Sequence, residues 1–183
     1  MPQGTTAGYV LAGGRSSRMG TDKSRLPWRG VTLIEYIASE VEAAAGTVTI
    51  VGGALHGKLR VIPDEFPGFG PLGGIATALA DSPAEWTLVT ACDMPGLTRD
   101  WLLDLLGRAE GQVQAPRTSD GRIHPLIAVW HRSAAPTIRE AVLGGIHTVS
   151  EAVRALDRRW VEVADVNSVR NVNTPDDWAR LRE

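Results

Sequence analysis

The feature that most constrains the fold is a regular alternation of short apolar runs with longer segments of helical periodicity. Residues 86–91 (WTLVTA) are apolar almost throughout, as expected of a central strand covered on both faces. Strands that alternate with helices form a mostly parallel sheet. The pattern therefore predicts a three-layer α/β/α fold, with strands at residues 8–12, 47–51, 59–62, 86–91, 113–116, 127–130 and 160–163.

Capping signals predict where the helices begin and end. Thr32 and Glu35 have the spacing of a capping box, and Gly46 is placed to end the helix that follows. Thr148 and Glu151 have the same spacing and predict a second capping box. Further helices are expected at residues 75–80, 99–109 and 134–143 and from residue 174 onward.

Length and composition indicate a single domain over residues 1–183. The net charge of −2 argues against general affinity for nucleic acids or membranes. Cys92 is the only cysteine, which excludes an intrachain disulfide and suits a reducing compartment. With no signal peptide and no run of membrane-spanning length, we expect a cytoplasmic protein with no nucleic-acid or membrane partner.

A glycine-rich, cationic stretch follows the first predicted strand. Residues 10–23 (VLAGGRSSRMGTDK) contain Gly13 and Gly14, then Arg15, Arg18 and Lys23. Glycines let main-chain N–H groups approach a polyanion, and the cations add charge that attracts phosphates. We interpret the stretch as a phosphate-binding loop; the alternative is a basic surface loop between a strand and a helix.

Two well-known phosphate loops do not match this stretch. The P-loop ends in Gly-Lys-Ser/Thr, whereas Gly20 is followed by Thr21-Asp22-Lys23. The dinucleotide fingerprint requires G-x-G-x-x-G, and Gly13-Gly14-Arg15 does not supply it. The loop therefore belongs to a third type, and a kinase or GTPase is disfavoured.

Two more motifs follow predicted strands. Residues 63–74 (PDEFPGFGPLGG) form a proline- and glycine-rich loop that carries Asp64, and Asp93 follows residues 86–91 directly. Ligands of parallel α/β sheets bind at the carboxyl ends of the strands. The phosphate loop, this second loop and Asp93 are therefore expected to converge on one site.

Each candidate residue has a chemical role and a structural alternative. Asp93 is the predicted Mg²⁺ ligand, because Mg²⁺ favours one or two carboxylates together with substrate phosphates; the alternative is a capping or turn residue. Lys23 would bind phosphates as a point charge, and Arg15 and Arg18 could bind them bidentately or lie at the surface. Asp64 could bind a base or ribose, or cap nearby N–H groups.

Other polar residues carry weaker signals. His124, Asn171 and Asn173 stand beside prolines and apolar runs, and a buried histidine with its hydrogen bonds satisfied is the commoner interpretation of His124. The remaining histidines lack the spacing of zinc ligands.

Four motifs in this order resemble those of molybdenum cofactor guanylyltransferases. They are residues 11–23, residues 63–75, residues 91–95 (ACDMP) and residues 171–177 (NVNTPDD), with His124-Pro125-Leu126 as a weaker fifth. The resemblance covers nearly the whole chain and implies a Rossmann-like nucleotidyltransferase fold.

The resemblance also implies an activity and a set of roles. GMP would be transferred from GTP to Mo-molybdopterin with Mg²⁺, releasing pyrophosphate. The nucleotide would be bound by Lys23, Asp64, Asp93 and the loop residues Leu11, Ala12, Gly13, Gly14 and Arg15. Lys23, Asp93 and Arg18 would be catalytic, and His124, Asn171 and Asn173 would contact the pterin. Molybdenum-insertion or acceptor enzymes are expected as partners.

Three alternatives remain open. A cytidylyltransferase acting on the same pterin shares the fold, although such enzymes tend to have Asn-Lys where this chain has Asp22-Lys23, and lack the GPLGG loop. Transfer to a sugar phosphate would require a sugar-binding subdomain. A non-catalytic nucleotide sensor would be expected to lose Asp93 or Lys23. Gly52 and Gly53 stand where some family members have an asparagine that contacts the nucleotide.

Overall fold

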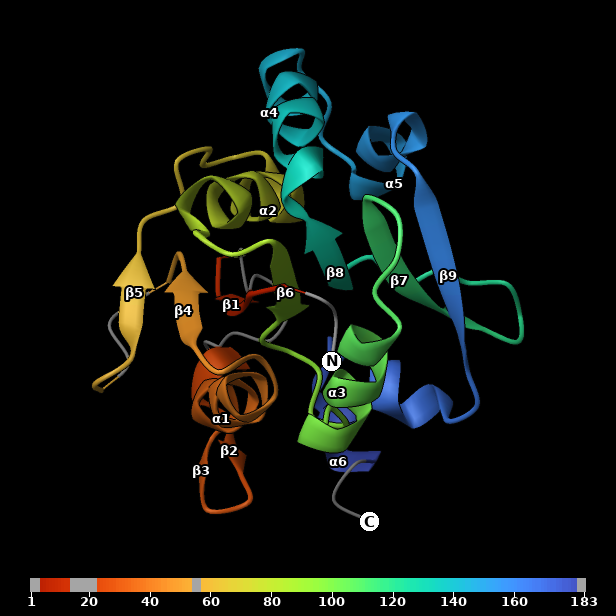
Figure 1. Cartoon of the computed structure of the whole chain (residues 1–183). Coiled ribbons are helices and arrows are strands. Elements are labelled where there is room, and N and C mark those ends of the chain that lie inside the picture. Colours follow the sequence, from red (N-terminus) through yellow and green to blue (C-terminus); the bar gives the residue numbers. More distant parts are fainter. Residues whose placement is uncertain (1–3, 14–22, 54–56, 181–183) are drawn as a thin grey trace.

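A computed structural model describes residues 4–13, 23–53 and 57–180 of the chain (Figure 1). Within them, a seven-stranded sheet has the order β5-β4-β1-β6-β8-β7-β9. Only β8 runs antiparallel to its neighbours, so the predicted mostly parallel sheet is confirmed. The strands are β1 Thr6–Leu11, β4 Val48–Val51, β5 Arg60–Ile62, β6 Trp86–Ala91, β7 Val113–Thr118, β8 Ile127–His131 and β9 Arg158–Val163.

Helices cover both faces of the sheet, which confirms the three-layer α/β/α prediction (Figure 1). One face carries α1 Leu33–Ala45, α3 Arg99–Gly107 and α6 Pro175–Arg180, and the other carries α2 Gly70–Asp81, α4 Ala135–Leu143 and α5 Val149–Ala152. Each layer has its own apolar core against the sheet. The short elements are the hairpin β2 Pro27–Trp28 and β3 Val31–Thr32, and the 3₁₀ turns η1 Lys23–Arg25, η2 Arg132–Ala134, η3 Val153–Ala155 and η4 Val166–Val169.

The ends of α1 are those that the sequence predicts. Thr32 Oγ1 accepts a hydrogen bond from the Glu35 amide at 3.4 Å, and Glu35 Oε2 accepts one from the Thr32 amide at 2.9 Å. Gly46 ends the helix at φ 82°, in the left-handed region that a glycine adopts without strain. Local side-chain chemistry alone therefore sets both ends of this helix.

The predicted start of α2 is wrong, because the helix begins at Gly70 and not at residue 75. Pro71 lies in its first turn, where a missing N–H is tolerated. A Cβ on Gly73 would lie 2.5 Å from Phe66 O, and one on Gly74 would lie 3.0 Å from Leu11 Cδ2. These glycines are helical and allow close packing, so the second half of the proline- and glycine-rich segment is not a loop.

The second predicted capping box is also wrong. α5 spans only Val149–Ala152, and Thr148 makes no side-chain hydrogen bond to the helix backbone. Its hydroxyl lies 3.5 Å from Glu151 Oε2 instead. The chain then continues into η3, so the segment is too short to need a full cap.

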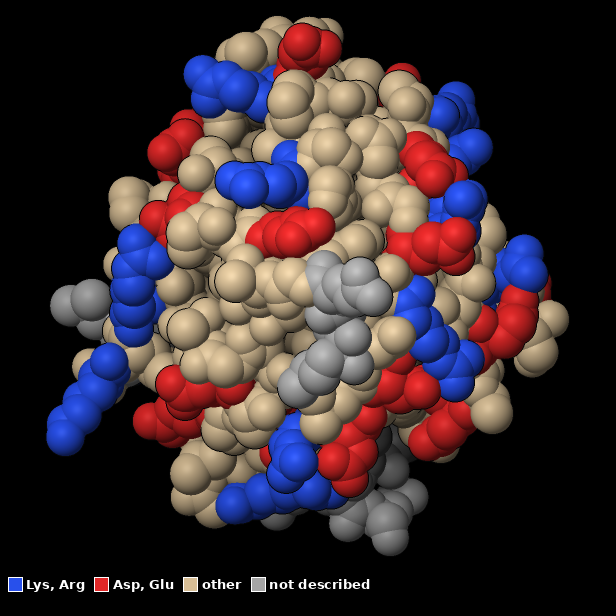
Figure 2. Space-filling view, in the orientation of Figure 1, with Lys and Arg blue, Asp and Glu red and all other residues tan. Residues whose placement is uncertain are grey.

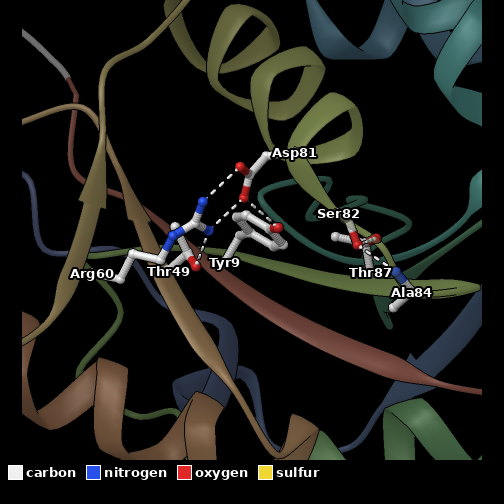
Figure 3. Close-up of polar contacts among 7 residues, drawn as sticks. All are labelled: Tyr9, Thr49, Arg60, Asp81, Ser82, Ala84 and Thr87. Carbon is white, nitrogen blue, oxygen red and sulfur yellow. Dashed lines mark hydrogen bonds and ion pairs between the residues drawn. The ribbon is translucent and has the colours of Figure 1, made fainter.

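A polar network ties β1, β4 and β5 to the end of α2 (Figure 3). Tyr9 is 2% exposed, and its hydroxyl donates to Asp81 Oδ2 at 2.8 Å. Arg60 donates to both oxygens of Asp81, at 2.7 and 2.8 Å, and to Thr49 Oγ1 at 3.0 Å. The hydrogen bonds from Arg60 lower the pKa of Asp81, and burial raises the pKa of Tyr9.

We expect Asp81→Ala to lower the free energy of unfolding by about 1–3 kcal/mol at neutral pH, because the buried Tyr9 hydroxyl loses its acceptor. The pKa of Asp81 is lower in the folded state, so its contribution is complete above the ordinary value of 3.8 and is lost as the pH falls below it. The difference between wild type and variant should therefore shrink in acid. Urea unfolding at several pH values measures it, and Asp100→Ala, at a side chain 92% exposed, is the control. A difference that persists in acid would contradict the assignment.

Candidate active site

A cavity of ≈ 710 Å³ lies at the carboxyl ends of β1, β4 and β5. Its lining combines Gly13 of the phosphate loop with the proline- and glycine-rich segment after β5. The sheet therefore brings together two of the three motifs that the sequence places at strand ends. The lining residues are Gly13, Gly52, Gly53, Asp64, Pro67, Gly68 and Gly70.

Gly52 and Gly53 shape this cavity. In the sequence they were notable only because some family members have an asparagine at this place. They adopt φ values of 73° and 74°, and the Gly52 amide donates to Ile62 O at 2.9 Å. A Cβ on Gly52 would lie 3.2 Å from Gly13 Cα, and one on Gly53 would lie 3.0 Å from Ala12 Cβ. The glycine pair lets the end of β4 turn close against the end of β1.

The sheet already uses part of the main chain at the end of β1. Leu11 O accepts from the Cys92 amide at 3.2 Å, and the Ala12 amide donates to Val51 O at 3.0 Å. Main-chain contacts to a ligand at this point would therefore fall on the Ala12 carbonyl and on Gly13. The Cys92 contact also places the residue after β6 directly beside β1.

Asp64 both lines the cavity and organises the loop around it. Its Oδ1 accepts from the Phe66 amide at 2.9 Å and from Thr77 Oγ1 at 3.1 Å. Thr77 is buried in α2, and it also accepts from the Glu65 amide at 3.0 Å. Asp64 thus caps a nearby N–H group, as the structural alternative predicts, and these hydrogen bonds hold its carboxylate at the cavity wall.

The same loop is supported from outside by residues that the sequence did not mark as functional. The His147 ring stacks on Phe69, with centroids 4.5 Å apart and planes 6° apart. The Arg139 guanidinium lies 5.8 Å from the centroid of the Phe66 ring. The segment from α4 to α5 therefore braces the loop that forms one wall of the cavity.

Asp93 follows β6 at the same edge of the sheet, next to the end of β1. Asn171 Nδ2 donates to Asp93 Oδ1 at 3.0 Å, and the Val172 amide donates to Asp93 O at 2.8 Å. The structure thus joins Asp93 to one of the asparagines predicted near the C-terminus. Nothing in the sequence pattern indicated this contact.

The carboxylate of Asp93 suits a hard cation whose other ligands come from a substrate. Within residues 4–13, 23–53 and 57–180, no three His, Cys, Asp or Glu side chains gather into a metal-binding group. A protein-only cage, as in a structural zinc site, is therefore not found there. A single carboxylate beside a phosphate site is instead the arrangement that Mg²⁺ uses, with phosphate oxygens completing its coordination.

His124 is a buried residue at the same sheet edge, held by the turn between β7 and β8. It is 8% exposed, and burial lowers the pKa of its ring, so the neutral form is favoured. Thr118 Oγ1 donates to Asp120 Oδ1 at 2.6 Å and lies 3.4 Å from His124 Nε2. The hydroxyl oxygen can therefore accept a hydrogen bond from the Nε2–H tautomer, in which Nδ1 is an acceptor. This geometry agrees with the structural interpretation of His124 as a buried histidine with a hydrogen-bond partner.

Asn173 belongs to the N-terminal turn of α6. Its main-chain amide and that of Thr174 donate to Asp177 Oδ2 at 3.0 and 2.9 Å. The Asp177 amide donates in return to Thr174 Oγ1 at 3.1 Å, which confirms the predicted helix start. Asn173 and Asn171 are thus held by different partners.

Several predicted residues cannot be placed. Gly14, Arg15 and Arg18 lie outside the described residues, and of Lys23 only the main chain is described, as the first residue of η1. Figure 2 shows acidic and basic side chains interspersed over the face in view. In the part of the chain that is described, no helix has the length and apolar character needed to cross a bilayer.

Comparison with known proteins agrees with the fold. Residues 8–162 match the family model of the MobA-like NTP transferase domain. The molybdenum cofactor guanylyltransferase of Serratia proteamaculans is 31% identical over 185 residues, which cover 96% of this chain and 93% of that protein. The probable molybdenum cofactor guanylyltransferase of Mycobacterium marinum is 34% identical over 183 residues, covering 93% and 90%.

A solved structure shows the same architecture. The crystal structure of molybdopterin-guanine dinucleotide biosynthesis protein A from Archaeoglobus fulgidus superposes with a TM-score of 0.81 at 26% identity, covering 95% of each chain. The family match extends from β1 into β9 and so includes the cavity and Asp93. The chain belongs to the MobA-like NTP transferase family.

Proposed function

We propose that this protein transfers GMP from GTP to Mo-molybdopterin, releasing pyrophosphate and forming the guanine dinucleotide form of the cofactor. The observation that carries the proposal is the shared edge of the sheet, where Gly13, Asp64 and Asp93 follow β1, β5 and β6 in a chain of this family. Relatives that cover over nine-tenths of the chain are named molybdenum cofactor guanylyltransferases. We propose a single nucleotidyltransferase domain that works in the cytoplasm.

The strand order supports a division of this edge between the two substrates. The cavity lies over β5, β4 and β1 and receives GTP, whose phosphates meet the loop after β1. β8, β7 and β9 lie beyond β6 and carry the acceptor side, where His124 and Asn173 are the pterin candidates. Asp93 follows β6, between these halves. This is the position at which the α-phosphate and the acceptor must meet.

Individual residues have distinct tasks in this arrangement. The end of β1 at Leu11 lies beside the nucleotide, and the main chain of Ala12 and Gly13, with Gly14 and Arg15, contacts it. Lys23 places its charge against the phosphates. Arg18 stabilises the leaving pyrophosphate. Asp64 lies on the guanosine side of the cavity, and its contacts to Phe66 and Thr77 fix the loop that forms the wall there.

Mg²⁺ is the proposed cation, and Asp93 is its ligand from the protein. When bound, Mg²⁺ supplies positive charge at the α- and β-phosphates, where negative charge grows as pyrophosphate leaves. The single carboxylate and the polar neighbour Asn171 fit this role, since substrate oxygens provide the other ligands.

The reaction requires no residue that acts as a general base. An oxygen of the terminal phosphate of the pterin is already ionised, and it attacks the α-phosphorus of GTP. That P–O bond forms as the bond from the α-phosphorus to the bridging oxygen breaks, and the electron pair leaves with pyrophosphate. Catalysis by this chain therefore consists of positioning the two phosphates and stabilising their charge.

Selective nucleotide binding tests the proposal. With Mg²⁺ present, GTP should raise the melting temperature more than CTP or ATP. A ligand at about 100 times its Kd adds roughly 2.7 kcal/mol to the free energy of unfolding. Selectivity for CTP would instead indicate the cytidylyltransferase, and stabilisation by no nucleotide would contradict the proposed site. Binding of GTP without transfer to the pterin would indicate a sensor.

A further inference from the structure

The segment that follows β9 returns to the end of β6, three places away in the sheet order. After β9 and η4, the chain runs along the face covered by α1 and α3, where Val169 and Val172 are 0% and 1% exposed. Burial of these residues fixes the path of the chain between them. Asn171 lies in this fixed stretch, so its side chain reaches Asp93 from a buried anchor.

The loop that carries Asp93 is held closely on both sides. A Cβ on Gly96 would lie 2.2 Å from Asn167 O, so the returning segment packs directly against the loop backbone. On the side of α1, the Tyr36 hydroxyl donates to Leu97 O at 2.8 Å, and this contact is buried. The backbone of the loop is therefore fixed before any ligand binds.

Hydrogen bonds from Asn171 and Val172 reach Asp93 itself, and they have different consequences. The bond from the Val172 amide to Asp93 O, at 2.8 Å, fixes the main chain. The bond from Asn171 Nδ2 to Oδ1, at 3.0 Å, fixes the direction of the carboxylate. Carboxylates that bind metals are commonly oriented by such a second hydrogen bond.

The chemical type of the donor matters here. Arginine or lysine at this position would orient the carboxylate, but its positive charge would repel a divalent cation at the same oxygen atoms. An amide donates a hydrogen bond without a net charge. Asn171 therefore orients Asp93 without adding a positive charge that would repel the cation.

We propose that Asn171 is a positioning residue for the divalent cation. It acts through Asp93 and does not serve as a pterin ligand. The inference rests on the proposed function, since it assumes that Asp93 binds the cation. It separates the two asparagines of the NVN motif by task. Asn171 serves the metal side, and Asn173, held at the start of α6, is left for the acceptor.

The test measures how GTP binding depends on the cation in the absence of any pterin. Mg²⁺ or Mn²⁺ is titrated at fixed GTP with the full chain, and binding is followed by calorimetry. Asn171→Ala and the similarly sized Asn171→Leu should raise the cation concentration needed for half-maximal binding by about 10- to 100-fold, as second-shell changes do. Binding should recover at high cation concentration, which a pterin ligand does not predict.

Two controls distinguish positioning from a general loss of structure. Asn167→Ala removes an exposed asparagine from the same segment and should leave the cation dependence unchanged. In an Asp93→Ala background, Asn171→Ala should have no further effect, because the residue it acts through is gone. The melting temperature of each variant is measured without ligands, and GTP binding is then compared at a temperature at which all variants are folded.

The outcomes separate this inference from the function on which it rests. If wild type binds GTP with a cation dependence that Asn171→Ala and Asn171→Leu share unchanged, the positioning role is refuted and the proposed function stands. Additive effects of Asn171→Ala and Asp93→Ala would also refute it. If wild type binds no GTP, or binds it without regard to the cation, both the site assignment and the positioning role fail.

Discussion

Replacing Asp93 with asparagine should reduce GMP transfer by roughly 10³-fold, the largest functional effect that we expect from any single change. Stabilisation of phosphate charge by a bound cation is worth several kcal/mol, and each factor of ten in rate corresponds to about 1.36 kcal/mol. Asparagine keeps the size of the side chain and removes the charge. The measurement is pyrophosphate release at saturating GTP and pterin over a range of Mg²⁺ concentrations.

A matched control exists on α3. Asp104 is a half-exposed carboxylate whose Oδ2 lies 3.0 Å from Arg108 Nη2, one helical turn away. Asp104→Asn should leave transfer unchanged, because surface ion pairs of this kind contribute little. Equal rates for Asp93→Asn and wild type at every Mg²⁺ concentration would exclude Asp93 as the metal ligand.

A large effect on stability should come from a single methyl group at Gly8. This residue lies in the middle of β1, where a Cβ would be 2.4 Å from Val41 Cγ1 and 2.6 Å from Thr47 O. The carbonyl belongs to the backbone, so rotation of a side chain cannot relieve the overlap. Gly8→Ala should lower the free energy of unfolding by about 1–3 kcal/mol, the usual range for overpacking.

Gly107→Ala provides the comparison for this change. Gly107 ends α3, and a Cβ there would meet no atom within 4 Å. The same substitution should therefore leave the free energy of unfolding unchanged or raise it by up to about 1 kcal/mol. Both values come from urea unfolding at neutral pH. Equal stability of the two variants would show that α1 does not pack against β1 as closely as described.

The strands could be predicted because each one is a local pattern. Residues 86–91 are apolar in sequence and become β6, whose six residues are all buried. The motifs after β1, β5 and β6 could be assigned to one edge, because parallel strands share the direction in which they end. The order of the strands could not be predicted, since it depends on contacts between distant segments.

Errors arose where tertiary packing overrides local propensity. Gly73 and Gly74 predict a loop by composition, yet they lie within α2, and glycine is needed there because Phe66 and Leu11 approach too closely for any side chain. Thr148 has the spacing of a cap, but the helix after it is too short to use one. For the two glycines the decisive neighbours lie outside the local pattern.

The candidate site shows the same division. Asp93 stands out in sequence because a carboxylate follows a buried strand. The contact between Asp93 and Asn171 could not be predicted, because it spans 78 positions and depends on the path of the segment after β9. The bracing of Phe69 by His147 is likewise visible only once α4 and α5 are placed. Roles assigned from sequence therefore identify the site more readily than the residues that orient it.

The most direct test of the proposed function is the identity of the product. The chain is incubated with Mo-molybdopterin, Mg²⁺ and equal concentrations of GTP, CTP and ATP, and the released cofactor is analysed by mass spectrometry. Guanylyl transfer predicts one dinucleotide, which contains GMP, together with pyrophosphate in equal amount. A product that contains CMP or AMP, or no dinucleotide from a sample that binds GTP, would contradict it.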